Sequence, residues 1–244
     1  MALSWRKKKT EKMKLSVNIL CWNNYNILHD TLHNLAEELK NIEHEIIIVD
    51  NGSTDGCQDL ATIKNGKNLG ISIAKNQGIE ASRGEFILLL DGDILYMPGS
   101  ITCMFDWLEK YPKEYAIGFY PNRFANERGL EEEMCIRLYE PKIHTAACLF
   151  YGMFRRTMFD RDIKCSVDGP FALPGYGWED RDFFMQMQAK GIKQWVAHIN
   201  SATGKYYHAI NSSIKQMGHD VYISSSRERA KFFKDKWISS LTPT

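Results

Sequence analysis

Two groups of carboxylates stand directly after apolar runs of the chain. Asp91-Gly92-Asp93 follows the run Glu85–Leu90, and Asp50-Asn51 follows Glu45–Val49. Two carboxylates separated by one glycine can point at one position, and their oxygens suit a hard cation such as Mg²⁺ or Mn²⁺. The pattern therefore predicts a metal site at Asp91 and Asp93, for which an ordinary surface turn is the alternative interpretation.

The segment around Asp50 and the next predicted helix have a similar setting. Asp50 could accept a hydrogen bond from a nucleotide base or a ribose hydroxyl, or it could form an Asx turn that leads into the next helix. Residues Gly70–Gly78 (GISIAKNQG) open a helix after a glycine. Helix N-termini favour anions, and Lys75 adds a positive charge, although an ordinary helix with a solvated lysine remains the alternative.

The densest group of chemically able residues is Gly175–Asp180 (GYGWED). Its glycines permit a tight loop, and the rings of Tyr176 and Trp178 offer flat faces that stack on sugars. Glu179 and Asp180 stand at a predicted helix start, where they could take a hydroxyl proton or only complement the helix dipole. We favour the chemical role. His208 lies further along in KYYHAINS, and a lone histidine is by itself either structural or a ligand.

These residues need elements that bring them together. Three short apolar runs are typical of buried strands: Leu15–Cys21, Glu45–Val49 and Glu85–Leu90. A further, brief strand is expected between the last two, at Thr62–Lys64. Helices are expected to follow these strands. The first carries a stripe of leucines, another covers Ile71–Ala81, and another begins at Pro98-Gly99-Ser100. A short helix is also expected after Asp50, with Ser53 or Thr54 as its cap. Alternating strands and helices predict an α/β fold with a parallel sheet, in which ligands bind beyond the carboxyl ends of the strands.

The second half of the chain is less regular. Its expected elements are strands at Ala116–Tyr120 and Gln194–His198, a surface excursion at Asn122–Lys142, a central strand within Thr145–Phe154, a loop at Asp160–Trp178, and helices at Glu179–Lys190 and Val221–Trp237. No internal repeat or low-complexity linker interrupts the chain. We therefore expect one domain over residues 1–244.

Composition excludes several classes of protein. Of 244 residues, 44% are hydrophobic, which excludes a disordered chain, and a net charge of +1 excludes a bulk polycation. The six cysteines form no C-x-x-C pair, so a zinc ribbon is excluded and reduced thiols are expected. The longest apolar runs are about five residues, too short to span a bilayer. The basic N-terminus lacks the apolar core of a signal peptide, so the expected location is cytoplasmic.

Five segments, in order, resemble the family 2 glycosyltransferases of the GT-A fold. They are LSVNILCWNNYNILHDTLHNL, EIIIVDNGSTDG, NLGISIAKNQGIEASRGEFILLLDGDI, ACLFYGMFRRTMFD and GYGWEDRDFFMQMQAKGIK, which together span most of the chain from Leu15. The resemblance implies a Rossmann-like, mostly parallel sheet with helices on both faces. It also implies a donor half at about 14–115, an acceptor half at about 116–220, and a C-terminal helix at 221–244.

The family's functional residues carry over position by position. The resemblance implies a nucleotide-sugar pocket and a metal site, with the base held by Asp50 and the metal by Asp93. The remaining pocket residues would be Trp22, Asn23, Asn51, Gly70, Lys75, Asp91 and Gly92, and Asp91 could also contact the metal. His208 resembles a family histidine that completes the metal shell. Asp180 would be the catalytic base, with Glu179, Trp178 and Tyr176 shaping the acceptor site.

The activity so implied is a metal-dependent, inverting hexosyl or pentosyl transfer from a nucleotide-sugar, with UDP as the expected nucleotide and Mn²⁺ or Mg²⁺ as the cofactor. The acceptor would be a saccharide or glycoconjugate. Modified bases in phage DNA are the alternative acceptor, motivated by the basic segment Arg227–Lys236. A non-catalytic nucleotide-sugar-binding protein on the same fold is a further alternative. Lys75 departs from the arginine that the family often has, and the membrane helices of processive synthases are missing.

Overall fold

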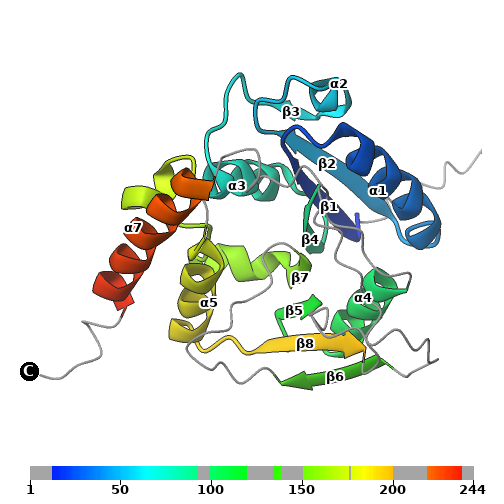
Figure 1. Cartoon of the computed structure of the whole chain (residues 1–244). Coiled ribbons are helices and arrows are strands. Elements are labelled where there is room, and N and C mark those ends of the chain that lie inside the picture. Colours follow the sequence, from blue (N-terminus) through cyan, green and yellow to red (C-terminus); the bar gives the residue numbers. More distant parts are fainter. Residues whose placement is uncertain are drawn as a thin grey trace, which may run out of the picture.

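The chain forms a layered α/β structure in a computed structural model, which describes residues 13–92, 99–119, 134–138, 151–175, 177–199 and 219–237 (Figure 1). Its strands are β1 (Leu15–Cys21), β2 (His44–Asp50), β3 (Ile63–Lys64), β4 (Phe86–Asp91), β5 (Ala116–Phe119), β6 (Met134–Leu138), β7 (Tyr151–Arg155) and β8 (Gln194–Ile199). Its helices are α1 (Tyr25–Glu38), α2 (Cys57–Leu60), α3 (Ile71–Ala81), α4 (Ser100–Lys110), α5 (Glu179–Ala189) and α7 (His219–Trp237), with 3-10 turns η1 (Arg156–Arg161) and η2 (Gly169–Ala172).

The strands form one sheet in the order β3-β2-β1-β4-β7-β5-β8-β6. Strands β1 to β4 are mutually parallel where they pair, and β5 and β8 are parallel to each other. Only β7 and β6 run against their neighbours. The mostly parallel sheet confirms the expected fold class, and β7, between β4 and β5, is the central strand expected within Thr145–Phe154.

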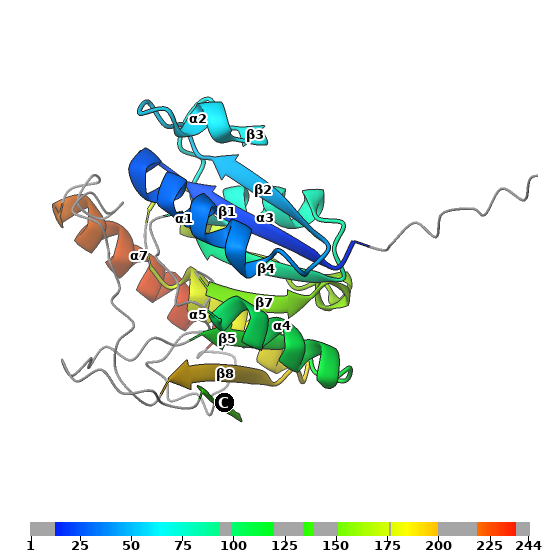
Figure 2. The same cartoon turned by 90° about the vertical axis from the view of Figure 1, so that its right-hand side faces the viewer.

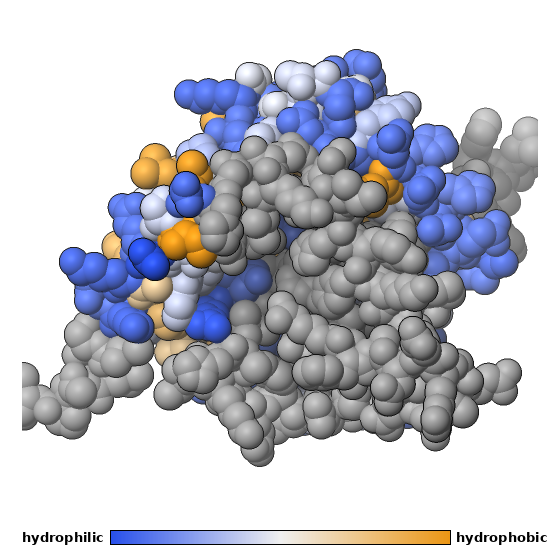
Figure 3. Space-filling view, viewed as in Figure 1, coloured by the Kyte–Doolittle hydropathy of each residue, from blue (hydrophilic) through white to orange (hydrophobic). Residues whose placement is uncertain are grey.

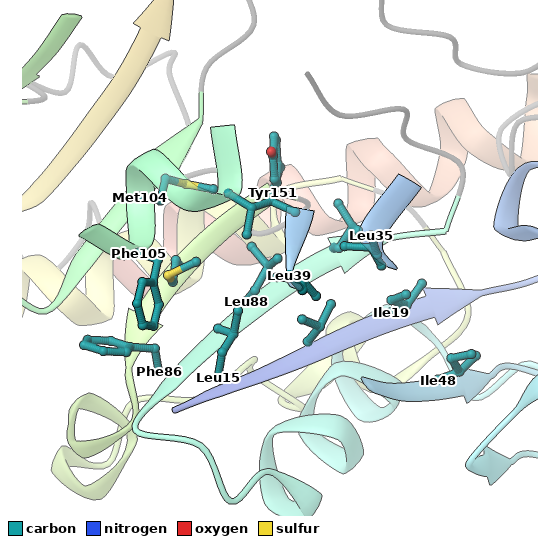
Figure 4. Close-up of a cluster of buried hydrophobic side chains, with 14 of the residues drawn as sticks. Leu15, Ile19, Leu35, Leu39, Ile48, Phe86, Leu88, Met104, Phe105 and Tyr151 are labelled. Atoms are coloured by element: carbon teal, nitrogen blue, oxygen red, sulfur yellow. The ribbon is translucent and has the colours of Figure 1, made fainter. Parts of the chain in front are cut away.

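Helices cover both faces of the sheet, as Figures 1 and 2 show. On one face, alternate residues of β1 and β4 pack against α1 and α4; Figure 4 shows part of this cluster, including Leu15, Leu35, Leu88 and Met104. On the other face, Ile87 and Leu89 of β4 belong to a cluster that contains residues of α5. Each fully buried aliphatic side chain contributes about 1.5–3 kcal/mol of transfer free energy, so these two layers hold the strand ends in place.

Most expected elements are present, and two expectations are wrong. Strand β6 lies inside Asn122–Lys142, which was expected to be a surface excursion. It is the last strand of the sheet and pairs with β8. Its short run, MCIRL, directly follows three glutamates, so the segment as a whole has the charged character of a surface loop. Neither Ser53 nor Thr54 caps α2: the Cys57 N–H instead donates to the Asp55 carboxylate (3.2 Å). The loop expected at Asp160–Trp178 also contains η2 and the end of η1.

The cysteines whose side chains the structure describes are free thiols, as expected: Cys21, Cys57, Cys103 and Cys165. Among the described helices, none combines the length and the apolar character needed to cross a membrane. The division of the chain into donor half, acceptor half and C-terminal helix stays an interpretation of the sequence.

Candidate functional site

The carboxylates expected at strand ends lie on one edge of the sheet. Because β2 and β4 flank β1 in parallel, Asp50 is paired with Cys21 and Asp91 with Leu20 at the carboxyl end of β1. In parallel α/β sheets this edge is where ligands bind. The tertiary structure therefore brings Asp50 and Asp91 to either side of one strand end, as the sequence predicted.

Gly92 closes the chain tightly over the end of β1. Its N–H donates to the Leu20 carbonyl oxygen at 2.7 Å. A Cβ at this position would lie 2.9 Å from both that oxygen and Asn24 Nδ2, closer than real Cβ atoms come. Gly92 is therefore needed so that Asp91 can stand beside β1. The predicted metal ligand Asp93 lies outside the described residues.

Lys75 and Asp91 form a buried ion pair. Lys75 Nζ lies 2.5 Å from Asp91 Oδ1, and the exposed fractions of the two side chains are 4% and 24%. Burial lowers the pKa of Lys75, but the Asp91 carboxylate outweighs this effect and leaves the pKa raised. The ammonium therefore stays charged, and its contact with the phosphate of a donor stays a prediction.

The acidic start of α5 comes from the other half of the chain. Glu179 is buried; its Oε1 accepts from the Gly177 N–H (3.2 Å), and its Oε2 pairs with Arg229 Nη1 (3.0 Å). Burial raises the pKa of Glu179, and the Arg229 guanidinium offsets only part of that rise. The Glu179 carboxylate is thus held by protein groups and is not free to move.

The carboxyl group of Asp180, the second residue of α5, has a raised pKa. Burial raises its pKa well above the usual range, and the neighbouring Glu179 and Asp91 raise it further, while Lys75 and Arg181 oppose the rise. The pKa of Asp180 on α5 therefore depends on Lys75 of α3 and Asp91 of β4 as well as on its neighbour Glu179. A carboxylate with a raised pKa is a better acceptor of a hydroxyl proton.

Trp178 precedes α5 with a left-handed backbone (φ +73°). Such a conformation is costly for a residue with a side chain, and it is concentrated at functional sites. The centroid of the Trp178 ring lies 5.2 Å from that of Phe233 on α7. The Arg181 guanidinium lies 4.2 Å from the centroid of the same Trp178 ring. Trp178 is therefore half-buried against α7, and its contact with an acceptor stays a prediction. Tyr176, the other predicted acceptor-binding aromatic, lies outside the described residues.

Asp50 serves the turn that follows β2. The side chain is buried, and its oxygens accept from the N–H groups of Gly52 (3.2 Å) and Ser53 (3.1 Å). These bonds are those of the Asx turn that was the alternative interpretation. Contact with a nucleotide base stays a prediction, to which the structure adds a structural role.

Asn51 and Asn23 hold the loops around the predicted nucleotide pocket. Asn51 Oδ1 accepts from the Leu69 N–H (3.0 Å), and Asn51 Nδ2 donates to Asn68 Oδ1 (3.0 Å). Asn23 Oδ1 accepts from the Thr54 N–H (2.8 Å), which ties the end of β1 to the turn after β2. Both side chains thus order loops, and Trp22 lies half-buried beside Asn23.

Gly70 is one of the points at which the first and second halves of the chain touch. It has a left-handed φ of +90°, and a Cβ there would lie 2.8 Å from the Leu173 carbonyl oxygen. Glycine is therefore required for the loop after η2 to pack against the start of α3. The predicted contact of Gly70 with a donor stays a prediction; the observed neighbour is this loop.

The chemistry of Asp91 fits a divalent cation, since carboxylate oxygens are the ligands that Mg²⁺ and Mn²⁺ prefer. Of the three predicted ligands, only Asp91 is described; Asp93 and His208 lie outside the described residues. Within the described ranges, no three or more His, Cys, Asp and Glu side chains form a group that could hold a metal ion. The metal site stays a prediction.

Sequence reasoning missed the role of α7. Arg229 contacts Glu179, while Lys236 Nζ and Trp237 Nε1 contact the buried Asp182 of α5 at 2.9 and 2.7 Å. A signal was present, since Arg229, Phe233 and Lys236 are spaced i, i+4, i+7 and so share one helix face. Because lysine and arginine are usually exposed, their charge concealed this buried stripe.

Comparison with known proteins agrees with this geometry. The description "Glycosyl transferase family 2" matches residues 16–171, which run from β1 through η2. EpsH of Bacillus subtilis, which carries the name of a glycosyltransferase, is 31% identical over 230 residues, covering 84% of this chain and 64% of EpsH.

Two solved structures share the fold. TarS of S. aureus in complex with UDP-GlcNAc has a TM-score of 0.58 at 19% identity, covering 81% of this chain and 58% of that one. A mannosyltransferase of Pyrobaculum calidifontis in complex with GDP-Man and Mn²⁺ has a TM-score of 0.54 at 16% identity, covering 81% and 59%. The chain spans less than two thirds of the length of each of these three relatives. Since the family match covers more than half of the chain, the chain belongs to glycosyl transferase family 2.

Proposed function

We propose that the chain transfers a sugar from a nucleotide-sugar to an acceptor hydroxyl with inversion, assisted by Mn²⁺ or Mg²⁺. One observation carries this proposal: the ion pair of Lys75 and Asp91 stands at the carboxyl edge of the sheet, and the charges of both residues shift the pKa of Asp180 at the start of α5. This arrangement has a cationic group suited to a diphosphate and a carboxylate suited to a hydroxyl proton within one site.

Asp180 is proposed as the general base. An acceptor hydroxyl has a high pKa and must lose its proton as it attacks the anomeric carbon, so a carboxylate of raised pKa gives the transfer a larger driving force. In a direct displacement the base and the leaving diphosphate stand on opposite sides of the sugar, which inverts the anomeric carbon. Asp180 of α5 and Asp91 of β4 are proposed to stand on these two sides of the sugar.

Asp91, together with Asp93 and His208, is proposed to hold the divalent cation, which would neutralise negative charge that develops on the departing diphosphate. Lys75 acts on the same diphosphate through its charged ammonium, held 2.5 Å from Asp91. The protein groups thus bind and orient the donor, and they keep a positive charge next to the bond that breaks.

The donor is proposed to be a UDP-sugar. TarS is solved with UDP-GlcNAc and the P. calidifontis mannosyltransferase with GDP-Man, so a nucleotide-sugar is the donor class that both neighbours support. Trp22, Asn23, Asp50 and Asn51 are proposed to line the nucleotide side, because they surround the ends of β1 and β2.

The acceptor is proposed to be a saccharide or a glycoconjugate. The DNA alternative rested on the basic segment Arg227–Lys236, but Arg229 and Lys236 pair with buried carboxylates, and acidic Glu228 and Asp235 are interleaved with the remaining basic residues. Figure 3 shows hydrophobic patches as well as hydrophilic surface toward α7. The described surface of α7 therefore lacks the continuous positive stripe that phosphate backbones need.

The test is a thermal-shift screen of UDP-, GDP- and dTDP-sugars with and without Mn²⁺. A donor that binds the folded chain stabilises it by mass action and so raises the melting temperature. At a donor concentration about one hundred times its dissociation constant, the free energy of unfolding rises by about 2.7 kcal/mol. We expect one nucleotide class to act, and Mn²⁺ to enlarge the shift in the wild type but not in D91N. A screen without any shift would contradict the proposal. Donor binding without hydrolysis or transfer to any acceptor would instead favour the non-catalytic alternative.

A further inference from the structure

Arg229 is the largest fully buried side chain in the described structure, with 1% of the residue exposed. Arginine is almost never buried to this degree unless its charge is paired. It lies on α7, far along the chain from α5, yet it faces the first residue of that helix. Figure 1 shows α7 alongside α5 on the same side of the sheet.

The guanidinium of Arg229 holds two segments at once. Nη1 lies 3.0 Å from Glu179 Oε2, and Nη2 donates to the Leu173 carbonyl oxygen at 2.8 Å. A Cβ on Gly175 would lie 3.0 Å from Arg229 Nε, so the backbone of the 173–175 loop packs directly against the guanidinium. Because its donors have a fixed planar geometry, this contact fixes the loop relative to the start of α5.

The same loop reaches the donor side of the site. The Leu173 carbonyl that Arg229 binds also lies against Gly70, at the start of α3. Helix α3 carries Lys75, the partner of Asp91. A chain of direct contacts therefore runs from Arg229 to both Glu179, the residue before Asp180, and the start of α3.

A second ion pair keeps α7 in place. Lys236 Nζ lies 2.9 Å from Asp182 Oδ1, and Trp237 Nε1 donates to the same oxygen at 2.7 Å. Arg229 and Lys236 are seven residues apart, which is close to two helical turns, so both reach α5 from one face of α7. The position of Arg229 is thus determined by packing and not by its own contact alone.

We propose that Arg229 is a positioning residue for the transfer, acting through Glu179 and Leu173 to hold Asp180 in register with the donor side of the site. The proposal rests on the proposed role of Asp180. Arg229 does not meet the substrate; it holds the first turn of α5 and the loop before it. Its removal should therefore impair the chemical step more than donor binding.

The experiment measures steady-state transfer in R229M, R229K, E179Q and the double variant E179Q/R229M. We expect R229M to lower kcat about 100-fold, the size of loss that misplacement by about 1 Å produces, with the donor KM changed less than about threefold. R229K supplies a positive charge to Glu179 but lacks the planar set of guanidinium donors, so its kcat should lie between those of R229M and the wild type. If Arg229 acts through Glu179, the double variant should be no slower than R229M.

Two controls separate this effect from lost stability. R227M removes a charge from an exposed position of the same helix and should keep wild-type kcat. L35A opens a cavity in the core on the opposite face of the sheet, so it should lower the melting temperature without changing kcat at a temperature where it stays folded.

The outcomes are distinct. A kcat within twofold of wild type in R229M would overturn the proposal, as would multiplicative losses in E179Q/R229M or an equal loss of kcat in L35A. A wild type that lacks transfer activity refutes the proposed function itself. If D180N retains transfer while R229M is still impaired, the assignment of Asp180 as the base is refuted. The claim that Arg229 positions Asp180 is then refuted as well.

Discussion

The ion pair of Lys75 and Asp91 permits a quantitative test of the site's electrostatics, using Lys75→Met, Asp91→Asn and the double variant. Methionine keeps the length of the lysine stem and suits the buried position, where only 4% of the lysine side chain is exposed. The substitution removes the charge that lies 2.5 Å from Asp91 Oδ1 and leaves that carboxylate near Glu179 and Asp180.

The expected loss follows from the burial of the pair. Removing one partner of a fully buried ion pair costs about 3–5 kcal/mol. Since 24% of the Asp91 side chain reaches solvent, which relieves part of this penalty, we expect a smaller loss for K75M. We set it at about 2–3 kcal/mol, which at about 2–4 °C per kcal/mol for a chain of this size lowers the melting temperature by roughly 4–12 °C.

The assay is urea and thermal unfolding of the wild type, both single variants and the double variant. Neutralising both partners removes the unpaired charge, so K75M/D91N should be more stable than the sum of the single losses implies, by at least about 1 kcal/mol. A K75M variant within about 0.5 kcal/mol of the wild type, or strictly additive losses, would refute the view that the two charges stabilise each other.

Three other changes test the remaining parts of the site. D180N should keep donor affinity in titrations and lose transfer. The pKa of Asp180 is raised in the folded state, so ionisation of its carboxyl group lowers the stability of the wild type as pH rises. D180N should therefore have a higher melting temperature than the wild type at neutral pH, and no such gain below about pH 4, where the carboxyl group is protonated in both states. An equal gain at both pH values would contradict the raised pKa. D93A should abolish metal-dependent donor hydrolysis, and full activity would refute the metal assignment. G92A should lose about 1–3 kcal/mol in urea unfolding, because its Cβ would meet Leu20 O at 2.9 Å; wild-type stability would show that β1 can shift.

Much of the fold could be predicted from local patterns. The expected Ile71–Ala81 helix and Leu15–Cys21 strand have the bounds that the structure shows, because a stretch with regular apolar spacing and a glycine boundary folds much as its own sequence dictates. Strand β6 was missed because its pairing with β8, and not its own pattern, makes it a strand. The cap of α2 was wrong because several nearby polar side chains compete for the same N–H groups.

The candidate site divides in the same way. The sequence by itself determined which residues stand at strand ends and helix starts, since Asp50, Asp91 and Asp180 occupy these positions through elements that local periodicity predicts. The Asx turn of Asp50 was also within reach of the sequence, because its N–H partners Gly52 and Ser53 are local. Only the tertiary structure decided the distant partners: Lys75 for Asp91 and Arg229 for Glu179. A buried charge takes whichever opposite charge the packing of distant segments brings within reach, and no local spacing records that choice.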